Sequence, residues 1–409
     1  GCYGQTRIRT PRIDRMAAEG TRFTACYSGS PVCAPSRNVL MTGLHTGHTR
    51  IRDNSPAFGG TPELYHEGQR RLSLESSDVT VAEILKSAGY RTGITGKWGL
   101  GEPFTPGTPN RQGFDEWLGF LNQNHAADYY TDYLWQNESR VSIAENREAR
   151  KGIYVHDRFT EFALQFIRTH RSKRQNPFFL YLAYTIPHET LTIPELGSYA
   201  NESWDNTQKT YGAMVSRLDR DVGRVLDLLG ELGLDRKTLV FFTSDNGAPD
   251  KPATRFFRSN ALLRGHKADL YEGGIRVPMI ARWPGRIAAG KTVSIPWYFA
   301  DLLPTAAHFA QTPCPAVDGR DVSGLLLGSS ESVSERWLYW EKPQNGLKQA
   351  VRKGRWKAVR HNPGEPTELY DLEQDPSESE NLAASQPGLV CEIESYLKTA
   401  RTESPNWPT

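Results

Sequence analysis

The sequence predicts an α/β fold in which helices flank a large, mostly parallel sheet. Two nearly continuous apolar runs, PFFLYLAY at residues 177–184 and TLVFFT at residues 238–243, are typical of strands buried on both faces. Residues 157–170 and 211–229 instead repeat apolar side chains at helical spacing. Because buried strands alternate with helices along the chain, a mostly parallel sheet covered by helices is expected.

The first part of the chain shows the same alternation. Thr10 is suited to an N-cap and Pro11 to the first helical turn, and the apolar spacing that follows predicts a helix ended by Gly20. A further helix is expected to begin just after Cys33. The remaining early elements are predicted as strands at residues 21–27 and 90–95 and a helix at residues 79–88.

The pattern changes around Gly319, where short segments with turn residues between them replace the longer elements. They predict a small antiparallel sheet from residues 337–340, 349–352, 355–360 and 368–370, followed by a terminal helix at residues 387–400. We therefore predict a large α/β domain over residues 1–320 and a C-terminal subdomain over residues 321–409.

The beginning of the chain lacks the buried strand with which an α/β domain usually opens. The sequence begins at Gly1 without an initiator Met, and its first residues form neither a charged segment nor an apolar signal segment. Either the chain is a trimmed mature form or its first segment is missing; we favour the missing segment and expect a first strand ahead of Gly1.

Composition excludes several classes of protein. Lys+Arg 49 against Asp+Glu 47 gives a net charge of +2, with no run of like charge, so neither a nucleic-acid-coating protein nor a polybasic membrane protein is expected. No apolar run is long enough to span a bilayer. The 5 Cys are widely scattered, which argues against a dense disulfide framework.

Chemically useful side chains follow the predicted strands, at the edge of a sheet where α/β proteins bind ligands. Each has an ordinary structural interpretation when taken alone: a turn, a solvated Lys, a structural His or a buried thiol. Together they offer hard oxygen ligands for Ca²⁺ or Mg²⁺, cations for an anion, and a helix N-terminus. They are Asp245 and Asn246, Lys97 between two glycines, His188, and Cys33 with Arg37.

The motifs of this sequence together resemble those of a known family. Residues 33–37 (CAPSR) match the C-x-P-S-R signature of the type I sulfatases. Further resemblances occur in the family order over nearly the whole chain. They are GKW at residues 96–98, PH at 187–188, SDNG at 244–247, GHK at 265–267, YEGGIRVP at 271–278 and ELYDL at 368–372. The resemblance implies the alkaline phosphatase-like fold and sulfate ester hydrolysis.

The resemblance also implies roles for individual residues. In that family the Cys, here Cys33, is oxidised to formylglycine by a formylglycine-generating or anaerobic maturation enzyme. One hydroxyl of the hydrated aldehyde attacks sulfur, and the other then loses its proton as sulfate is expelled. Cations stabilise the charged sulfuryl group, and His188 protonates the leaving oxygen. The implied cations are Arg37, Lys97, Lys267 and a Ca²⁺, with Mg²⁺ as the alternative, held by Asp245, Asn246 and residue 33.

Two departures from the family pattern stand out. The family metal site also uses an Asp pair on its first strand, which this sequence lacks. The family His that follows Gly-Lys-Trp is Gly99 here, so the base must come from elsewhere or be dispensable. We predict His125 as the base, with His45 and His48 as alternatives, and substrate binding or a structural role is an equally good interpretation of all three.

Substrate specificity is predicted less sharply. Aromatic rings could stack on sugar faces, and Arg or Asn could bind ring hydroxyls, although loop packing is the slightly better interpretation of each aromatic residue taken alone. The candidates are Tyr129, Tyr130, Trp135, Arg255, Asn260 and Arg264. We expect an exo-acting enzyme on a sulfated galactose or N-acetylgalactosamine, exported to the periplasm or secreted. The competing hypotheses are a phosphodiesterase or phosphonate monoester hydrolase of the same superfamily and a catalytically dead, glycan-binding relative.

Overall fold

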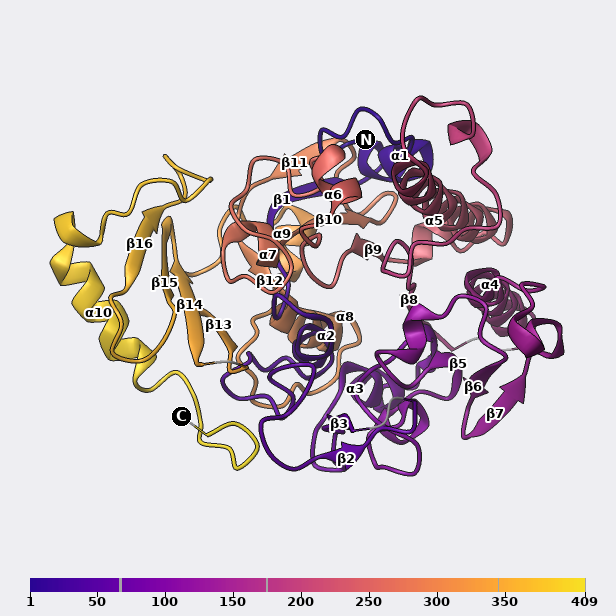
Figure 1. Cartoon of the computed structure of the whole chain (residues 1–409), viewed down its shortest axis with the longest axis horizontal. Coiled ribbons are helices and arrows are strands. Elements are labelled where there is room, and N and C mark those ends of the chain that lie inside the picture. Colours follow the sequence, from indigo (N-terminus) through magenta and orange to yellow (C-terminus); the bar gives the residue numbers. More distant parts are fainter. Residues whose placement is uncertain (66–67, 174–175, 345, 409) are drawn as a thin grey trace.

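The computed structural model describes residues 1–65, 68–173, 176–344 and 346–408. Its described strands form two five-stranded sheets, a four-stranded C-terminal sheet and a short hairpin (Figure 1). The first large sheet has the order β11-β1-β10-β9, with β12 beside β1. Its strands are β1 (Thr21–Tyr27), β9 (Val240–Thr243), β10 (Arg276–Arg282), β11 (Lys291–Val293) and β12 (Trp297–Tyr298).

The second large sheet has the order β7-β6-β5-β4-β8, and its strand β4 is parallel to both neighbours, β5 and β8. Its strands are β4 (Arg91–Lys97), β5 (Glu116–Phe120), β6 (Tyr133–Gln136), β7 (Ser139–Ser142) and β8 (Phe178–Ala183). In the first sheet, β10 is antiparallel to β1 and β9, while β11 and β12 are parallel to β1. The strands are therefore mixed in direction.

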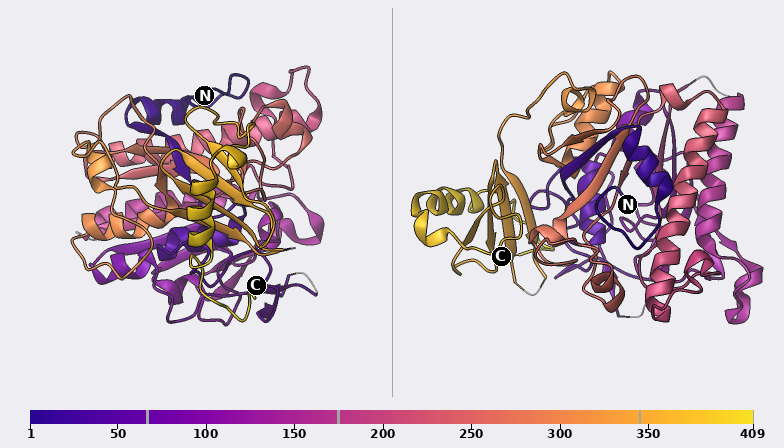
Figure 2. Two further views of the ribbon diagram at one scale, coloured as in Figure 1. Left: turned by 90° about the vertical axis from the view of Figure 1, so that its left-hand side faces the viewer. Right: turned by 90° about the horizontal axis from the view of Figure 1, so that it is seen from above.

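Helices cover these sheets, as Figures 1 and 2 show. The α-helices are α1 (Pro11–Ala18), α2 (Cys33–Thr42), α3 (Val81–Ser87), α4 (Val155–Lys173), α5 (Asn206–Glu231), α6 (Pro252–Phe256), α7 (Glu272–Ile275), α8 (Leu302–Phe309), α9 (Ser323–Leu327) and α10 (Pro387–Leu397). Short 3₁₀ helices are η1 (Pro109–Gln112), η2 (His125–Ala127), η3 (Ala144–Ala149), η4 (Gly197–Tyr199), η5 (Asp235–Lys237), η6 (Phe299–Asp301) and η7 (Ala383–Ser385). The α/β class predicted from the sequence is confirmed.

The C-terminal sheet forms a separate layer beside the larger part of the molecule (Figure 2). Its antiparallel order is β13 (Leu338–Lys342), β14 (Lys348–Lys353), β15 (Trp356–Arg360) and β16 (Glu368–Asp371). Ile393 and Leu397 of α10 pack against this sheet in a core of their own. The small antiparallel sheet with its terminal helix is therefore as predicted. The remaining hairpin consists of β2 (Thr61–Pro62) and β3 (Arg70–Arg71).

The two strands that most clearly predicted the fold are not buried on both faces. Among the described residues, β8 pairs only with β4, and β9 pairs only with β10. Their apolar side chains are half-buried, because the two strands line a cavity of about 2590 Å³. The same cavity reaches Lys97, Asp245 and Asn246.

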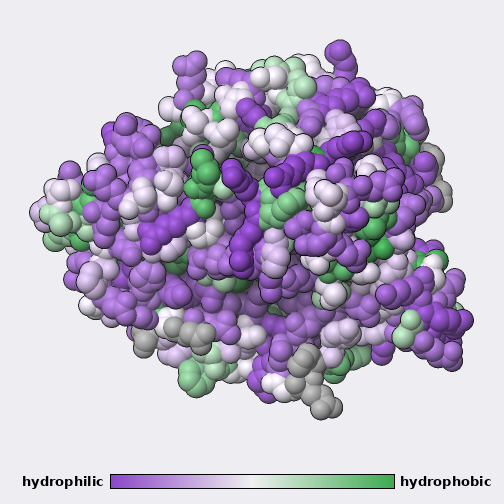
Figure 3. All heavy atoms as spheres, turned by 45° about the horizontal axis from the view of Figure 1, so that its top comes forward, coloured by the Kyte–Doolittle hydropathy of each residue, from purple (hydrophilic) through white to green (hydrophobic). Residues whose placement is uncertain are grey.

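The outer surface matches the composition. Figure 3 shows a face that is mostly hydrophilic, with apolar residues in small scattered groups. Among the described residues, no helix combines the length and the apolar character that a bilayer crossing requires.

Candidate active site

Cys33 is the first residue of α2, and its side chain is buried. Burial by itself would raise the pKa of the thiol. The charges of Lys97 and Lys267 and a hydrogen bond with His188 outweigh burial and the opposing charge of Asp245, and lower the pKa of Cys33 to about 5. The pocket therefore stabilises a negative charge at position 33. Reactive Cys residues are found in electropositive surroundings of this kind.

Arg37 lies one turn further along α2 and joins three parts of the site. Its Nε and Nη2 donate to Asp245 Oδ2 at 3.0 and 2.9 Å, and its Nη1 donates to the carbonyl of Lys97 at 2.5 Å. Ser36 Oγ donates to the carbonyl of Asp245 at 2.5 Å. The N-terminal turn of α2 is thereby attached to the loops after β9 and β4.

Lys97 is the last residue of β4 and is buried. Burial lowers the pKa of Lys97, and the facing charge of Cys33 opposes that effect. Burial would raise the pKa of Asp245, but Arg37, Lys97 and Lys267 together lower it to about 2. Three cationic side chains thus surround one carboxylate, so the pocket carries an excess of positive charge suited to an anion.

His188 and Lys267 meet from two different loops. The His188 Nδ1 lies 2.7 Å from the carbonyl of Glu189, which can only accept, so Nδ1 carries a proton. The ammonium of Lys267 lies 2.9 Å from His188 Nε2 and donates to it. The ring is thus held between the carbonyl of Glu189 on its Nδ1 side and the lysine ammonium on its Nε2 side.

Asp245 and Asn246 fit a hard divalent cation by the chemistry of their donors. Both offer oxygen atoms, and Asn246 Oδ1 is buried without a hydrogen-bond partner. Its amide nitrogen is occupied by the carbonyl of Gly247 at 2.9 Å. An orphaned, buried oxygen beside a carboxylate is consistent with a cation ligand.

His125 lies in an aromatic cluster. Its ring stacks on Tyr65 at 4.5 Å and lies 4.4 Å from the ring of Tyr133, and Nε2 is 2.7 Å from Thr131 Oγ1. Burial lowers the pKa of His125 to about 3. Since its described partners do not include Cys33, we do not retain His125 as the base.

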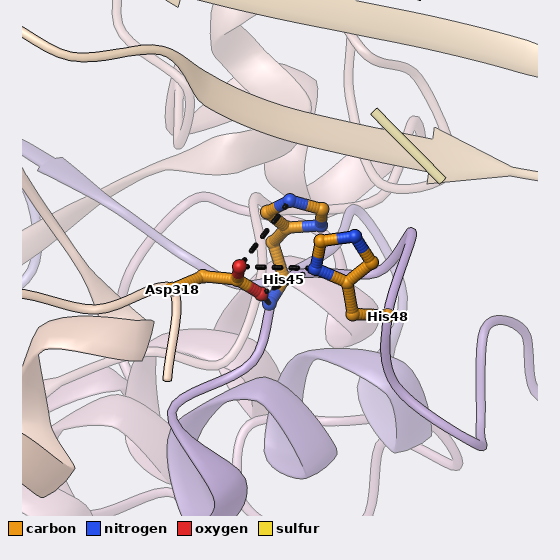
Figure 4. A group of neighbouring side chains, drawn as sticks. All are labelled: His45, His48 and Asp318. Atoms are coloured by element: carbon orange, nitrogen blue, oxygen red, sulfur yellow. Dashed lines mark hydrogen bonds and ion pairs between the residues drawn. The ribbon is translucent and has the colours of Figure 1, made fainter. Parts of the chain in front are cut away.

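The alternative bases, His45 and His48, lie together beside Asp318 (Figure 4). Their rings stack at 4.1 Å, and His48 Nδ1 is 3.0 Å from both carboxylate oxygens of Asp318. The three groups could in geometry surround one metal ion. However, the N–H of Gly47 donates to His45 Nδ1 at 3.1 Å, so the proton of the neutral ring sits on Nε2, the nitrogen that faces Asp318. This arrangement suits a structural contact better than metal ligation.

The position of the absent family His is filled by a residue that sequence reasoning missed. Gly99 has φ +78°, and a Cβ atom there would lie 1.8 Å from Gln123 Nε2. Gln123 is nearly buried, and its Oε1 has no hydrogen-bond partner. The glycine and the glutamine side chain are thus complementary in shape. Only the position of Gln123 two residues before His125 could have suggested it.

The predicted sugar-stacking residues are packed into the fold. Tyr129 is buried, and its hydroxyl donates to the carbonyls of Thr185 and His188 at 3.0 and 2.8 Å, so it supports the His188 loop. Tyr130 packs 5.4 Å from the ring of Tyr154, and Trp135 belongs to the main core. These contacts correspond to the loop-packing interpretation.

The three polar substrate candidates differ in their surroundings. Arg255 is exposed and pairs with Asp250 at 2.5 Å. Asn260 makes hydrogen bonds to both the N–H and the carbonyl of Ala248, which fixes the turn after Asn246. Arg264 donates to the hydroxyl of Tyr370 at 2.8 Å and so contacts the C-terminal sheet.

Comparison with known proteins identifies the family. The family model described as Sulfatase matches residues 1–312. The chain belongs to the sulfatase family. A second model, N-sulphoglucosamine sulphohydrolase, C-terminal, matches residues 266–403. This sulfatase is 32% identical to arylsulfatase A of Homo sapiens, over 97% of this chain and 83% of that protein. It is 34% identical to N-acetylgalactosamine-6-sulfatase of Rattus norvegicus, over 88% and 68%.

Solved structures agree. The sulfatase resembles Ps i-CgsB in complex with k-i-k-neocarrahexaose with a TM-score of 0.82 and 27% identity, covering 99% of this chain and 90% of that one. The phosphonate monoester hydrolase of Agrobacterium radiobacter, at 19% identity and a TM-score of 0.66, shares the fold. The protein is therefore a sulfuric ester hydrolase with the alkaline phosphatase-like fold, as the sequence motifs predicted.

Proposed function

We propose that this sulfatase hydrolyses sulfate esters of carbohydrates with a formylglycine made from Cys33 as its nucleophile. The observation that carries the proposal is the environment of Cys33, where Lys97, Lys267 and His188 stabilise an anion at a buried helix N-terminus. A formylglycine at this position would supply a hydrated aldehyde for attack on sulfur. Making it requires a formylglycine-generating or anaerobic maturation enzyme as a partner.

The cations bind and orient the sulfuryl group. The buried ammonium of Lys97 and the ammonium of Lys267 both act on position 33. Arg37 holds Asp245 and the carbonyl of Lys97 in place. Because these charges are already fixed by the fold, little reorganisation is needed when negative charge develops on the sulfuryl oxygens.

His188 is the proposed general acid. The carbonyl of Glu189 orients the ring through Nδ1–H, and Nε2 accepts from the Lys267 ammonium. When the ammonium of Lys267 turns to the oxygens of a bound sulfate ester, Nε2 would be free to hold a proton and pass it to the leaving oxygen. Such assistance contributes about 10²–10⁴-fold to the rate.

Asp245 and Asn246 would hold the divalent cation, proposed to be Ca²⁺ with Mg²⁺ as the alternative. The cation would neutralise charge on the bound sulfate ester. Two side chains supply fewer than the roughly 6–8 oxygens that Ca²⁺ takes. The cavity between β8 and β9 reaches both residues, so further oxygen ligands have room there.

The proposed substrate is a sulfated galactose or N-acetylgalactosamine at the end of a glycan, cleaved in the periplasm or outside the cell. The similarity to N-acetylgalactosamine-6-sulfatase and to the structure with bound k-i-k-neocarrahexaose supports this class. Among the predicted contacts, Arg255 is exposed and pairs only with Asp250 among the described residues, and it remains a proposed substrate contact.

The experiment is to produce the chain with a maturation enzyme and measure its intact mass and its activity together. Conversion of Cys33 changes the mass by about −18 Da. Converted enzyme should release sulfate from sulfated galactose or N-acetylgalactosamine, and Cys33→Ala should not. Faster turnover of a nitrophenyl phosphodiester than of nitrophenyl sulfate would refute the sulfatase assignment. Converted protein that binds sulfated glycans without turnover would indicate the inactive relative.

A further inference from the structure

We propose that Lys357 and Glu378 of the C-terminal part are positioning residues for Lys267, an inference that rests on the proposed function. Lys267 lies in a loop between Arg264 and Gly273, and among the described residues its ammonium pairs with His188 rather than with a residue of the C-terminal sheet. The C-terminal residues act instead on the two ends of that loop.

The Lys267 loop is closed on itself and attached to the other catalytic loops. The N–H of Gly273 donates to the carbonyl of Arg264 at 2.7 Å, which closes the loop at its base. The N–H of Lys267 donates to the carbonyl of Ala248, and the N–H of Ala268 to that of Pro31, at 2.9 and 3.0 Å. A displacement of the base would therefore move Lys267 relative to both Asp245 and Cys33.

Glu378 holds this base from the C-terminal side. Its Oε2 accepts the N–H of Glu272 at 2.7 Å, and its carbonyl accepts Arg264 Nη1 at 2.8 Å. The loop is closely packed at this base, since a Cβ at Gly273 would lie 2.2 Å from the carbonyl oxygen of Gly265. Both ends of the loop thus depend on one residue of the C-terminal part.

Lys357 of β15 fixes the two carboxylates involved. Its Nζ lies 3.0 Å from Glu272 Oε1 and 2.8 Å from Glu378 Oε1, and all three side chains have 0% exposure. Glu272 Oε2 also accepts the hydroxyl of Tyr27 at 2.6 Å. A buried ion cluster is weak support for stability, because apolar replacements of similar volume are often as stable. We therefore assign the Lys357, Glu272 and Glu378 cluster a different role, which is to hold the ends of the Lys267 loop in a fixed geometry.

A second buried ion cluster at the same interface provides a matched control. Glu341 of β13 pairs with Arg52 at 3.1 Å and Arg401 at 3.0 Å and is fully buried. Its side-chain partners among the described residues lie outside the Lys267 loop. Glu341→Gln should weaken domain docking without moving Lys267.

The test is a double-mutant cycle on converted enzyme with nitrophenyl sulfate. Glu378→Gln should lower kcat about tenfold and Lys357→Met up to about 10²-fold, because misplacement by about 1 Å can cost that much. In a Lys267→Met background neither substitution should lower kcat further, since the group they position is gone. Glu378→Gln keeps the test decisive if Lys357→Met does not fold.

Equal losses of kcat with and without Lys267, or the same loss in Glu341→Gln, would overturn the inference. Hydrogen exchange supplies a readout independent of activity: amides of residues 264–273 should exchange faster in Glu378→Gln than in Glu341→Gln. Faster exchange in an enzyme that turns over no sulfate ester would refute the proposed function and leave the positioning intact. Unchanged exchange would refute the positioning.

Discussion

The electrostatics of the pocket can be measured directly on unconverted protein, in which Cys33 is still a thiol. Lowering its pKa from 9.0 to about 5 corresponds to about 5 kcal/mol in favour of the thiolate, at roughly 1.4 kcal/mol per pKa unit. A single neighbouring charge contributes about 1–3 pKa units. Lys97→Met should therefore move the midpoint of Cys33 ionisation upwards by that amount.

The assay follows thiolate absorbance in the ultraviolet as a function of pH, in the presence of a chelator, with Cys33→Ser spectra subtracted. Lys353→Met, a substitution on the C-terminal sheet at a side chain paired with Glu392, serves as the control and should leave the midpoint unchanged. A wild-type midpoint at the ordinary thiol value, or one that Lys97→Met does not move, would refute the electrostatic reasoning.

The same lowered pKa predicts the pH dependence of stability. A group whose pKa is lower in the folded state stabilises the fold fully above its unfolded pKa, and that contribution is lost as pH falls to the folded value. The difference in free energy of unfolding between unconverted wild type and Cys33→Ser should thus grow from pH 5 to pH 9, the interval between the two pKa values. Urea denaturation at several pH values measures it, and a difference that falls with pH would contradict the sign.

Three further predictions follow from single residues. Arg37→Met should lower the free energy of unfolding by about 3 kcal/mol, which is near the low end for a buried ion pair because two lysines still face Asp245. As the control, Arg255→Met removes an exposed ion pair and should lower it by less than about 1 kcal/mol in the same urea denaturation assay. Because we do not retain His125 as the base, His125→Phe should keep kcat within about tenfold of the wild-type value. The loss of a general base costs about 10²–10⁴-fold, so a decrease of kcat in that range would support the predicted role of His125. Asn246→Ala should weaken Ca²⁺ binding measured by calorimetry, and an unchanged affinity would show that the Asn246 side-chain oxygen is not a ligand of the cation.

The helices and strands were predicted well because the signals for them, apolar spacing and capping residues, involve residues close together in the sequence. The helix predicted at residues 211–229 is α5, which starts earlier at Asn206 because Asp205 and Gln208 form a capping box. Likewise Thr80 and Glu83 cap α3 within the predicted segment 79–88. Three of the predicted site residues, Lys97, His188 and Asp245, surround Cys33 although they are far apart in the sequence, because each lies at or after the carboxyl end of a strand.

What could not be predicted depends on contacts between distant segments. The antiparallel placement of β10 between β1 and β9 follows from packing, and the apolar run of β10 is equally compatible with a parallel neighbour. His125 carried no local sign that aromatic rings would enclose it. Gln123 fills the space beside Gly99 from another loop, so no spacing rule connects the two.

The charge of the pocket also explains why modification of Cys33 and binding of a sulfate ester suit one another. In the unconverted protein the thiolate is an internal anion that faces Lys97 and Lys267. A formylglycine carries no charge, so the proposed conversion removes that anion and leaves the cations without it. A sulfate ester brings a negative charge to the same place, and its burial is favoured because the cations are already desolvated and fixed. The net charge of +2 spread over the chain does not reveal this local excess, which the loops after β4 and β9 and the loop that carries Lys267 create together.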